Sequence, residues 1–271
     1  RVKCPHSGDA APGSGESRLR GQTKSLAIVR IVTRVIEING VTKKYGAKTA
    51  VEDVSFTAAP GRVTGFLGPN GAGKSSTLRI LLGLDRATAG TALIDGAPYA
   101  TLAQPLRTVG AMLDGASAVP ERRGVDHLRW IAQSNRIPTG RIGEVLETVG
   151  LTDAATVRVK KYSLGMKQRL GLAAALLGEP RVLVLDEPVN GLDPEGIRTV
   201  RTFLRRYADA GNTVLLSSHL MGETAETVDD IVIIDKARII ATGTLAEITD
   251  GHASLEEAFF ALTGSEPGES W

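Results

Sequence analysis

Short apolar runs separated by glycine and proline dominate the chain from residue 35 onward. Alternating or β-branched residues predict three strands in this part, at residues 35–38, 51–58 and 62–67. A glycine-rich turn follows the third strand, and leucines then recur at helical spacing within residues 73–84, at Leu78, Leu81 and Leu82. The pattern therefore predicts a strand, a glycine loop and a helix in succession.

The spacing of apolar residues becomes helical between residues 108 and 178. Three candidate helices lie there, at residues 125–135, 141–150 and 170–177. Strands return at residues 181–185, 213–216 and 231–234, with a helix near residues 195–208. Strands that alternate with helices are typical of a parallel sheet covered by helices, so we predict an α/β fold with a helical insert.

The last periodic segment predicts a short amphipathic helix. Ser254 and Glu257 have the spacing of a capping box, and Gly264 marks the end of the helix. Apolar residues follow at positions i, i+3, i+4 and i+7, at Leu255, Ala258, Phe259 and Leu262. We expect this apolar stripe to pack on its own domain, with a partner contact as the alternative.

The charge is unevenly distributed along the 271 residues, of which 42% are hydrophobic. Residues 1–34 hold seven Lys or Arg and two acids, whereas the remainder holds 25 and 28. Because the first stretch is also rich in Gly, Ser and Pro, we expect a disordered leader rather than a contact for anionic lipid or nucleic acid. The remainder is slightly acidic, so we expect no nucleic-acid partner.

No window of the chain predicts a membrane span. The most apolar early stretch, residues 26–38, is interrupted by Arg30, Arg34 and Glu37, and it does not have the pattern of a signal peptide. The single cysteine, Cys4, cannot form a disulfide framework or a cysteine metal site. A protein with these features acts at a membrane only by docking onto a separate membrane protein.

The glycine loop carries the strongest chemical signal. Its sequence, Gly68-x-x-x-x-Gly73-Lys74-Ser75, fits a phosphate-binding loop whose backbone N–H groups converge on phosphate oxygens. Lys74 would reach the β and γ phosphates, and Ser75 would bind Mg²⁺. We expect the nucleotide to contact Gly68, Pro69, Asn70, Gly71, Ala72, Gly73, Lys74, Ser75 and Ser76. An ordinary glycine turn is the alternative, which the preceding strand and following helix disfavour.

Two carboxylates follow the apolar run at residues 182–185. Ligands of open α/β sheets lie at the carboxyl ends of the strands, so Asp186 and Glu187 would meet the phosphates there. Asp186 can hold Mg²⁺, and Glu187 can orient or deprotonate the attacking water. Two solvated acids at a strand end are the alternative, and the phosphate loop makes it the weaker one.

Together these residues resemble the ATP-binding subunits of ABC transporters, over nearly everything from residue 35 to 264. The resemblance implies a RecA-like P-loop NTPase core at about 35–107 and 179–245 with an antiparallel β subdomain. It also implies a helical insert at about 108–178 and a C-terminal helix at about 254–263, with 265–271 as a tail. In that family an aromatic residue stacks on adenine, and Tyr45 in Lys44-Tyr45-Gly46 looks like it.

Residues 162–169 look like the family's signature segment, whose usual form is Leu-Ser-Gly-Gly-Gln. Ser163 and Gly165 match the positions whose hydroxyl and backbone N–H approach the γ-phosphate. Leu164 and Met166 depart from the pattern, and a leucine is less tolerant than glycine of a positive φ.

Three further positions of the family pattern fall in this sequence. Residues 190–193 resemble the loop that signals across the dimer, and His219 resembles the switch histidine that contacts the γ-phosphate. The glutamine of the family, which begins the loop into the helical insert, is replaced by Asp114. Its side chain is one methylene shorter than glutamine and is charged, so the family's metal contact does not carry over directly to Asp114. We expect the other histidines, at 6, 127 and 252, to be surface or packing residues.

The resemblance implies ATP and Mg²⁺ as ligands and a head-to-tail homodimer in which Lys74 of one subunit and Ser163 of the other enclose each ATP. Glu187, His219 and Lys74 would be the catalytic residues. The dimer would work at the cytoplasmic face of the cell membrane with a separate permease, gripped by residues 114–130. Export of a drug, antibiotic or peptide is favoured over other transport. The alternatives are a soluble ABC-type ATPase acting on ribosomes or DNA, a phosphate-loop kinase or GTPase, and a binding protein with a dead site.

Overall fold

A six-stranded sheet forms the centre of the part of the chain that the computed structural model describes, residues 35–113 and 118–264. The expected leader 1–34, Asp114 and the tail 265–271 lie outside the described residues. The strand order is β5-β6-β7-β3-β8-β9. Their bounds are Val109–Met112, Val182–Asp186, Thr213–Ser218, Val63–Leu67, Asp230–Asp235 and Arg238–Thr244. The first five are parallel, and β9 alone runs antiparallel, beside β8.

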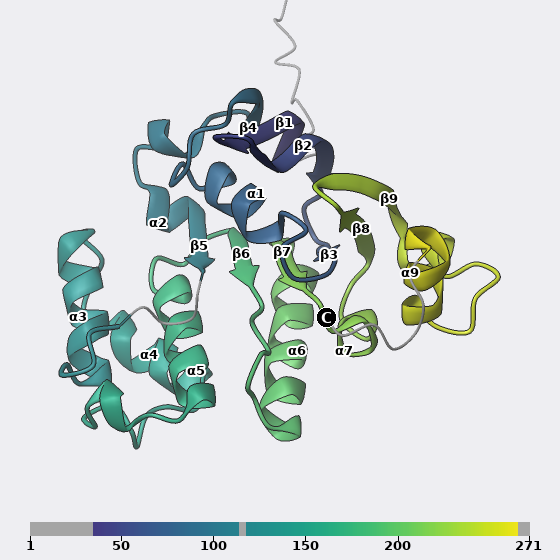
Figure 1. The fold of residues 1–271 in the computed structure, drawn as a ribbon. Coiled ribbons are helices and arrows are strands. Elements are labelled where there is room, and N and C mark those ends of the chain that lie inside the picture. The colour runs from purple at the N-terminus through teal and green to yellow at the C-terminus, as the bar shows by residue number, and fades with distance from the viewer. Residues whose placement is uncertain (1–34, 114–117, 265–271) are drawn as a thin grey trace, which may run out of the picture. The chain divides into compact units, whose positions relative to one another are not determined.

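A second, antiparallel sheet has the order β2-β1-β4 and lies at the top of Figure 1. Its strands are β1 (Ile36–Tyr45), β2 (Lys48–Ala58) and β4 (Ala89–Ile94). Helix α1 (Lys74–Leu81) lies between the two sheets and contacts β1, β2 and β4 as well as β6. The fold is thus an α/β core joined to an antiparallel subdomain, as the resemblance implies.

The remaining helices cover the other face of the large sheet or form the insert. They are α2 (Pro105–Thr108), α3 (Gly124–Ser134), α4 (Arg141–Thr148), α5 (Leu164–Leu176), α6 (Pro194–Asp209), α7 (Met221–Ala225), α8 (Leu245–Ile248) and α9 (Leu255–Thr263). Short 3₁₀ turns are η1 (Tyr99–Thr101) and η2 (Val159–Lys161). Figure 1 shows α3, α4 and α5 grouped at one end of the sheet, beyond β5.

Alternation along the buried strands divides the core into two clusters. In β6, Val182 and Val184 pack toward α1 and the antiparallel sheet, whereas Leu183 and Leu185 pack toward the helices of the opposite face. This follows from the two-residue period of a strand, which sends successive side chains to opposite faces. All five residues of β6 are buried, as expected for a central parallel strand.

Three strands were absent from the predicted pattern. The stretch that includes β5 was predicted to begin the helical insert, but residues 109–112 instead pair with β6 in the large sheet. With four residues and one glycine, β5 has too little alternation to identify. Gly110 is needed because a Cβ there would come within 2.1 Å of the Ala175 carbonyl oxygen of α5. The other two, β4 and β9, are partly exposed strands that carry glycine.

Helix α9 packs back on its own domain, as predicted. Leu255, Ala258 and Phe259 are buried in the core, and Leu262 stays 41% exposed. The predicted capping box is only half formed, because the Ser254 side chain accepts from Glu257 N, whereas the Glu257 carboxylate accepts from Ala253 N. A complete capping box instead begins α8, between Thr244 and Glu247.

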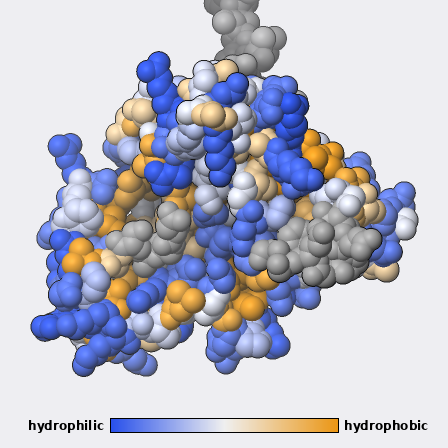
Figure 2. Space-filling view, viewed as in Figure 1, coloured by the Kyte–Doolittle hydropathy of each residue, from blue (hydrophilic) through white to orange (hydrophobic). Residues whose placement is uncertain are grey.

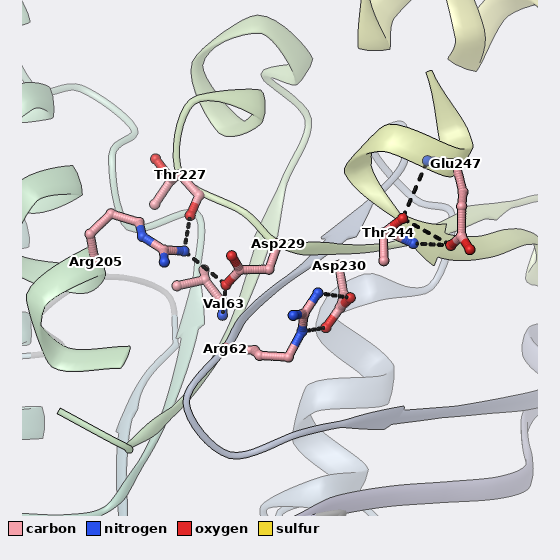
Figure 3. A network of polar contacts seen from close by, with 8 residues as sticks. All are labelled: Arg62, Val63, Arg205, Thr227, Asp229, Asp230, Thr244 and Glu247. Atoms are coloured by element: carbon pink, nitrogen blue, oxygen red, sulfur yellow. Dashed lines mark hydrogen bonds and ion pairs between the residues drawn. The ribbon is translucent and has the colours of Figure 1, made fainter. Parts of the chain in front are cut away.

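A polar network fixes the amino ends of β3 and β8 (Figure 3). The Arg62 guanidinium donates two hydrogen bonds of 2.5 Å to the Asp230 carboxylate, which raises the pKa of Arg62. The neighbouring Asp229 accepts from Val63 N at 2.8 Å and from Arg205 of α6 at 2.8 Å. These bidentate and shared contacts lock the two strands in register and anchor α6 at this end, so the opposite, carboxyl end is held in place for the site.

Candidate active site

The carboxyl ends of three adjacent strands, β3, β6 and β7, bring the predicted chemistry together. The phosphate loop follows β3, Glu187 follows β6, and His219 follows β7. Gly68 N donates to Ser218 O at 3.3 Å, and Glu187 N donates to Ser217 O at 3.2 Å. The segments that follow the three strands are therefore hydrogen-bonded to one another at the carboxyl end of the sheet. Segments far apart in the sequence therefore share one end of the sheet, where α/β folds bind ligands.

The phosphate loop requires glycine at two positions for different reasons. A Cβ on Gly68 would come within 2.2 Å of the Ile234 carbonyl oxygen, so the loop passes against the backbone of β8. Gly73 has φ 116, and a Cβ there would come within 2.6 Å of the Ala50 carbonyl oxygen. A side chain at either position would force the loop outward.

Lys74 lies inside this loop, with only 6% of its side chain exposed. Its Nζ donates to the carbonyl oxygens of Gly68 at 2.6 Å and Pro69 at 3.2 Å, and it lies 3.6 Å from Glu187 Oε1. Burial lowers the pKa of Lys74, although Glu187 and Asp186 oppose that shift. The ammonium group is therefore fixed by backbone carbonyls and has carboxylates close by, in the position of a phosphate ligand.

Asp186 and Glu187 have different environments although they are adjacent. Asp186 is buried, and its carboxylate accepts a short hydrogen bond from the Ser217 hydroxyl. Glu187 has φ 49, a left-handed conformation that is uncommon for a non-glycine residue. Its backbone N–H is shared between Ser217 O and Ser217 Oγ, each at 3.2 Å. Ser217 thus orients both acids, and the turn at Glu187 directs its side chain away from the strand.

His219 faces the Glu187 carboxylate. Its Nδ1 is 2.9 Å from Glu187 Oε2, but the two atoms are not aligned as a hydrogen bond, and both are buried without such a partner. Buried polar atoms that lack a partner are uncommon in native proteins and point to a missing ligand or water. Lys74 lies beside one oxygen of the Glu187 carboxylate and His219 beside the other. This arrangement fits a water molecule held by Glu187 beside a phosphate group.

The residues at this edge fit a magnesium ion that is held mainly by a nucleotide. Mg²⁺ in such sites takes one or two protein oxygens in addition to phosphate oxygens and water. Asp186 offers a carboxylate held by Ser217, and Ser75 offers an exposed hydroxyl on the first turn of α1. Among the described residues no group of three or more His, Cys, Asp or Glu could hold a metal alone, so the phosphates would be needed.

Tyr45 ends β1 with its ring 48% exposed. The hydroxyl donates to Asp85 Oδ2 at 3.1 Å, and Lys43 Nζ lies 4.7 Å from the ring centroid. Arg79 also pairs with Asp85 at 2.9 Å, which holds the pKa of that carboxyl below its usual value. An exposed aromatic ring fixed at its hydroxyl end is a platform for stacking a base.

The signature segment begins α5. Ser163 is the N-cap residue, and its hydroxyl accepts from Met166 N at 3.1 Å. Leu164, where the family pattern has glycine, starts the helix and is absent from the positive-φ residues of the described chain, so the leucine is not strained there. Figure 1 shows α5 apart from the loop between β3 and α1.

The signature segment packs instead on the loop that follows Glu187. Leu164 occupies the space beside Gly191, where a Cβ would lie 2.2 Å from Leu164 Cδ2. The buried Gln168 donates from Nε2 to Asn190 O at 3.3 Å, and Asn190 N donates to Glu187 O at 3.2 Å. A continuous series of contacts therefore links α5 to the backbone of Glu187 in the same subunit.

We expect Gly191→Ala to destabilise the protein by about 1–3 kcal/mol, because Gly191 has φ 73 and the new methyl group would meet Leu164. Adding Leu164→Ala should recover the part due to the clash and leave the backbone strain. Urea unfolding of the two single variants and the double variant measures the coupling. Gly143→Ala, in α4 with open space around it, is the control and should cost nothing. A Gly191→Ala variant as stable as the wild type would refute the packing.

Three supporting residues have no motif that could identify them. Ser217 joins both acids, Asp85 holds Tyr45, and Gln168 ties α5 to residue 190. Each acts through contacts between segments that are distant in the sequence. His127 is buried, in line with the predicted packing role, and burial lowers its pKa, helped by Arg122.

Comparison with known proteins gives a consistent family. The profile of the ABC transporter family matches residues 51–190. The uncharacterized ABC transporter ATP-binding protein YhcH of Bacillus subtilis (strain 168) is 43% identical over 229 residues, which cover 83% of this chain and 74% of the relative. The lantibiotic transport ATP-binding protein SrtF of Streptococcus pyogenes is 34% identical over 225 residues, which cover 83% and 96%.

Solved structures share the same fold. The ATP-binding subunit of an ABC transporter aligns with a TM-score of 0.76 and 29% identity, covering 84% of this chain and 99% of the other. The ATP-binding cassette MJ0796, in a dimeric post-hydrolysis state bound to ADP and Pi, aligns with a TM-score of 0.70, covering 78% and 98%. Its 21% identity supports the fold alone.

Proposed function

The chain belongs to the ATP-binding proteins of ABC transporters, and from this we propose that it drives the export of a drug, antibiotic or peptide through a separate permease. As a member of this family it binds and hydrolyses ATP. Export is supported by a relative that is 33% identical over 267 residues, the Nod factor export ATP-binding protein I of Mesorhizobium japonicum. A lantibiotic, the cargo named for the lantibiotic transport protein, supports a peptide antibiotic as cargo. The observation that supports the catalytic role is the grouping of Lys74, Glu187 and His219 at the carboxyl end of the large sheet.

In the proposed mechanism the phosphate loop and Lys74 bind the phosphates of ATP, and the adenine stacks on Tyr45. Glu187 would orient the attacking water and take its proton, while His219, whose Nδ1 lies 2.9 Å from Glu187 Oε2, would contact the γ-phosphate. Asp186 and Ser75 would hold Mg²⁺, which supplies charge neutralisation on the phosphates when bound. Asp114 lies outside the described residues and is given no role.

We propose a homodimer because one subunit holds only part of the site. Ser163 precedes α5, whereas Lys74 begins α1, so the two residues lie on different elements of one subunit. A cassette of the same fold forms a dimer with ADP and Pi bound, which is in keeping with a dimeric ATPase. Since Lys74, Asp186, Glu187 and His219 are all present, both sites of such a dimer would be complete.

The permease would dock on the groove between the core and the helical insert, at the cytoplasmic face of the membrane. This groove has a volume of about 400 Å³ and is lined mainly by apolar residues, among them Leu106 of α2, Leu113 after β5 and Ile131 of α3. Leu84, at its rim, is 59% exposed. None of the helices in residues 35–113 and 118–264 is both long and apolar enough to cross a membrane.

The test is affinity capture of the tagged protein from native membranes in mild detergent. We expect a multi-span membrane protein in the wild-type sample and about a tenfold lower yield with Leu84→Glu, because a charge would be placed at the groove. Leu262→Glu, at an exposed position of α9, is the matched control and should capture as much as the wild type. Capture of ribosomes or DNA in place of a membrane protein would favour the soluble ATPase and refute the proposal.

A further inference from the structure

Residues 120–124, which lead into α3, pair with residues 157–161, which precede the signature segment. We name these two segments together the basic ribbon. Arg123 and Arg158 form an antiparallel bridge. Gly124 N donates to Val157 O at 3.2 Å, Val159 N to Arg122 O at 2.9 Å, and Lys160 N to Pro120 O at 2.8 Å. Three backbone hydrogen bonds therefore hold the two segments in fixed register.

The ribbon concentrates positive charge on a chain that is otherwise slightly acidic. Its ten residues include one acid, Glu121, and five cations, which are Arg122, Arg123, Arg158, Lys160 and Lys161. Four of the five cations are exposed, and none of them lies in an ion pair within the described part of the chain. Like charges directly opposite each other in an antiparallel pair are destabilising. An external anion would therefore stabilise the pair of Arg123 and Arg158.

Apolar side chains flank these cations. Trp130 is 54% exposed and Val119 is 45% exposed, and the Arg122 guanidinium carbon lies 5.0 Å from the centroid of the Trp130 ring. Figure 2 shows hydrophilic side chains gathered over the outer end of the helical insert, with apolar ones between them. Cations mixed with an exposed indole are typical of surfaces that meet the headgroup layer of a membrane.

From these observations we propose that the basic ribbon, with Trp130, binds the anionic phospholipid headgroups of the membrane surface. The proposal rests on the proposed function, because it needs the protein to work beside a membrane. Arg123, Arg158, Lys160 and Lys161 are all exposed, so these cations lie on the surface. A cluster of four to eight Lys or Arg beside a membrane is typical of a site for anionic lipid.

The test is flotation of the full-length protein with vesicles at 0.15 M salt, comparing phosphatidylcholine alone with a mixture containing about 30% phosphatidylglycerol. We expect binding to the anionic vesicles, and roughly tenfold weaker binding for Arg123→Glu/Arg158→Glu. Lys48→Glu/Arg206→Glu reverses two exposed cations elsewhere that lie in no ion pair of the described chain. This control carries the same net charge and should float like the wild type.

Each outcome decides the proposal. Equal flotation of the ribbon variant and the control would overturn it, and would assign lipid binding to another part of the chain. Retained flotation together with lost binding to a glutamate-rich peptide or to single-stranded DNA would overturn it in favour of that partner. The ATPase rate in solution should be unchanged in the ribbon variant. Failure of flotation alone therefore leaves the proposed function standing, whereas failure of permease capture in the wild type removes the proposed function itself.

Discussion

Glu187→Gln should bind ATP with nearly wild-type affinity and hydrolyse it about 100-fold to 1000-fold more slowly. The amide keeps the size of the carboxylate and leaves the backbone contacts with Ser217 intact, so the turn at residue 187 should survive. It cannot accept a proton from water, and it removes the negative charge that lies 3.6 Å from Lys74 Nζ. Phosphate release in single-turnover reactions and nucleotide titration measure the two properties separately.

The control for this variant is Glu179→Gln. Glu179 also has a left-handed backbone, with φ 52, but it lies at the end of α5 and pairs with Arg141. Its replacement should leave hydrolysis unchanged, which separates the chemistry of Glu187 from the effect of altering a glutamate with positive φ. Hydrolysis by Glu187→Gln at the wild-type rate would show that another group activates the water.

Lys74→Ala should weaken ATP binding by about 100-fold or more, because it removes the buried ammonium group that the phosphate loop presents. The loss would also leave Asp186 and Glu187 without their nearby cation, so Lys74→Met, which keeps most of the side-chain volume, accompanies it. Both variants should lose binding, measured by isothermal titration, and thermal unfolding shows whether either one fails to fold. Binding by a folded Lys74→Met variant at wild-type affinity would contradict the assignment.

The same lysine predicts a pH dependence. Burial lowers the pKa of Lys74 below the ordinary value for lysine, so its charge is lost at a lower pH than that of an exposed lysine. ATP affinity should therefore be full when Lys74 is protonated and should fall as the pH rises through that lowered pKa. In Lys74→Met this alkaline fall should disappear, which the same titration repeated over pH can measure.

The sequence was most informative where a function depends on residues that are adjacent in the chain. The phosphate loop and the two acids after β6 are local patterns, and the structure places them in the predicted strand, loop and helix contexts. The helix predicted at 170–177 instead begins six residues earlier, at Leu164. The strands β4, β5 and β9 escaped prediction because they are short or only partly buried, and their pairing partners decide their conformation.

Contacts between distant segments could not be predicted from either motif or spacing. Leu164 looked like a strained departure from a glycine, but in the structure it fills the space beside Gly191, and its backbone is helical. Ser217 has no sequence signal that separates it from any other strand serine, yet it contacts both Asp186 and Glu187. The predicted capping box at Ser254 formed only in half, because the Glu257 carboxylate accepts from Ala253 N, one residue before the N-cap.

The central claim is that each ATP is hydrolysed between Lys74 of one subunit and Ser163 of a second. It is tested most directly by mixing two inactive variants, Lys74→Met and Ser163→Arg, and measuring ATP hydrolysis. In a mixed dimer the Lys74 of the second variant faces the Ser163 of the first, which restores one complete site. An equal mixture should therefore recover roughly a quarter of the wild-type rate, while each variant alone stays inactive. A mixture no more active than its components, or full activity of Ser163→Arg alone, would contradict the shared site.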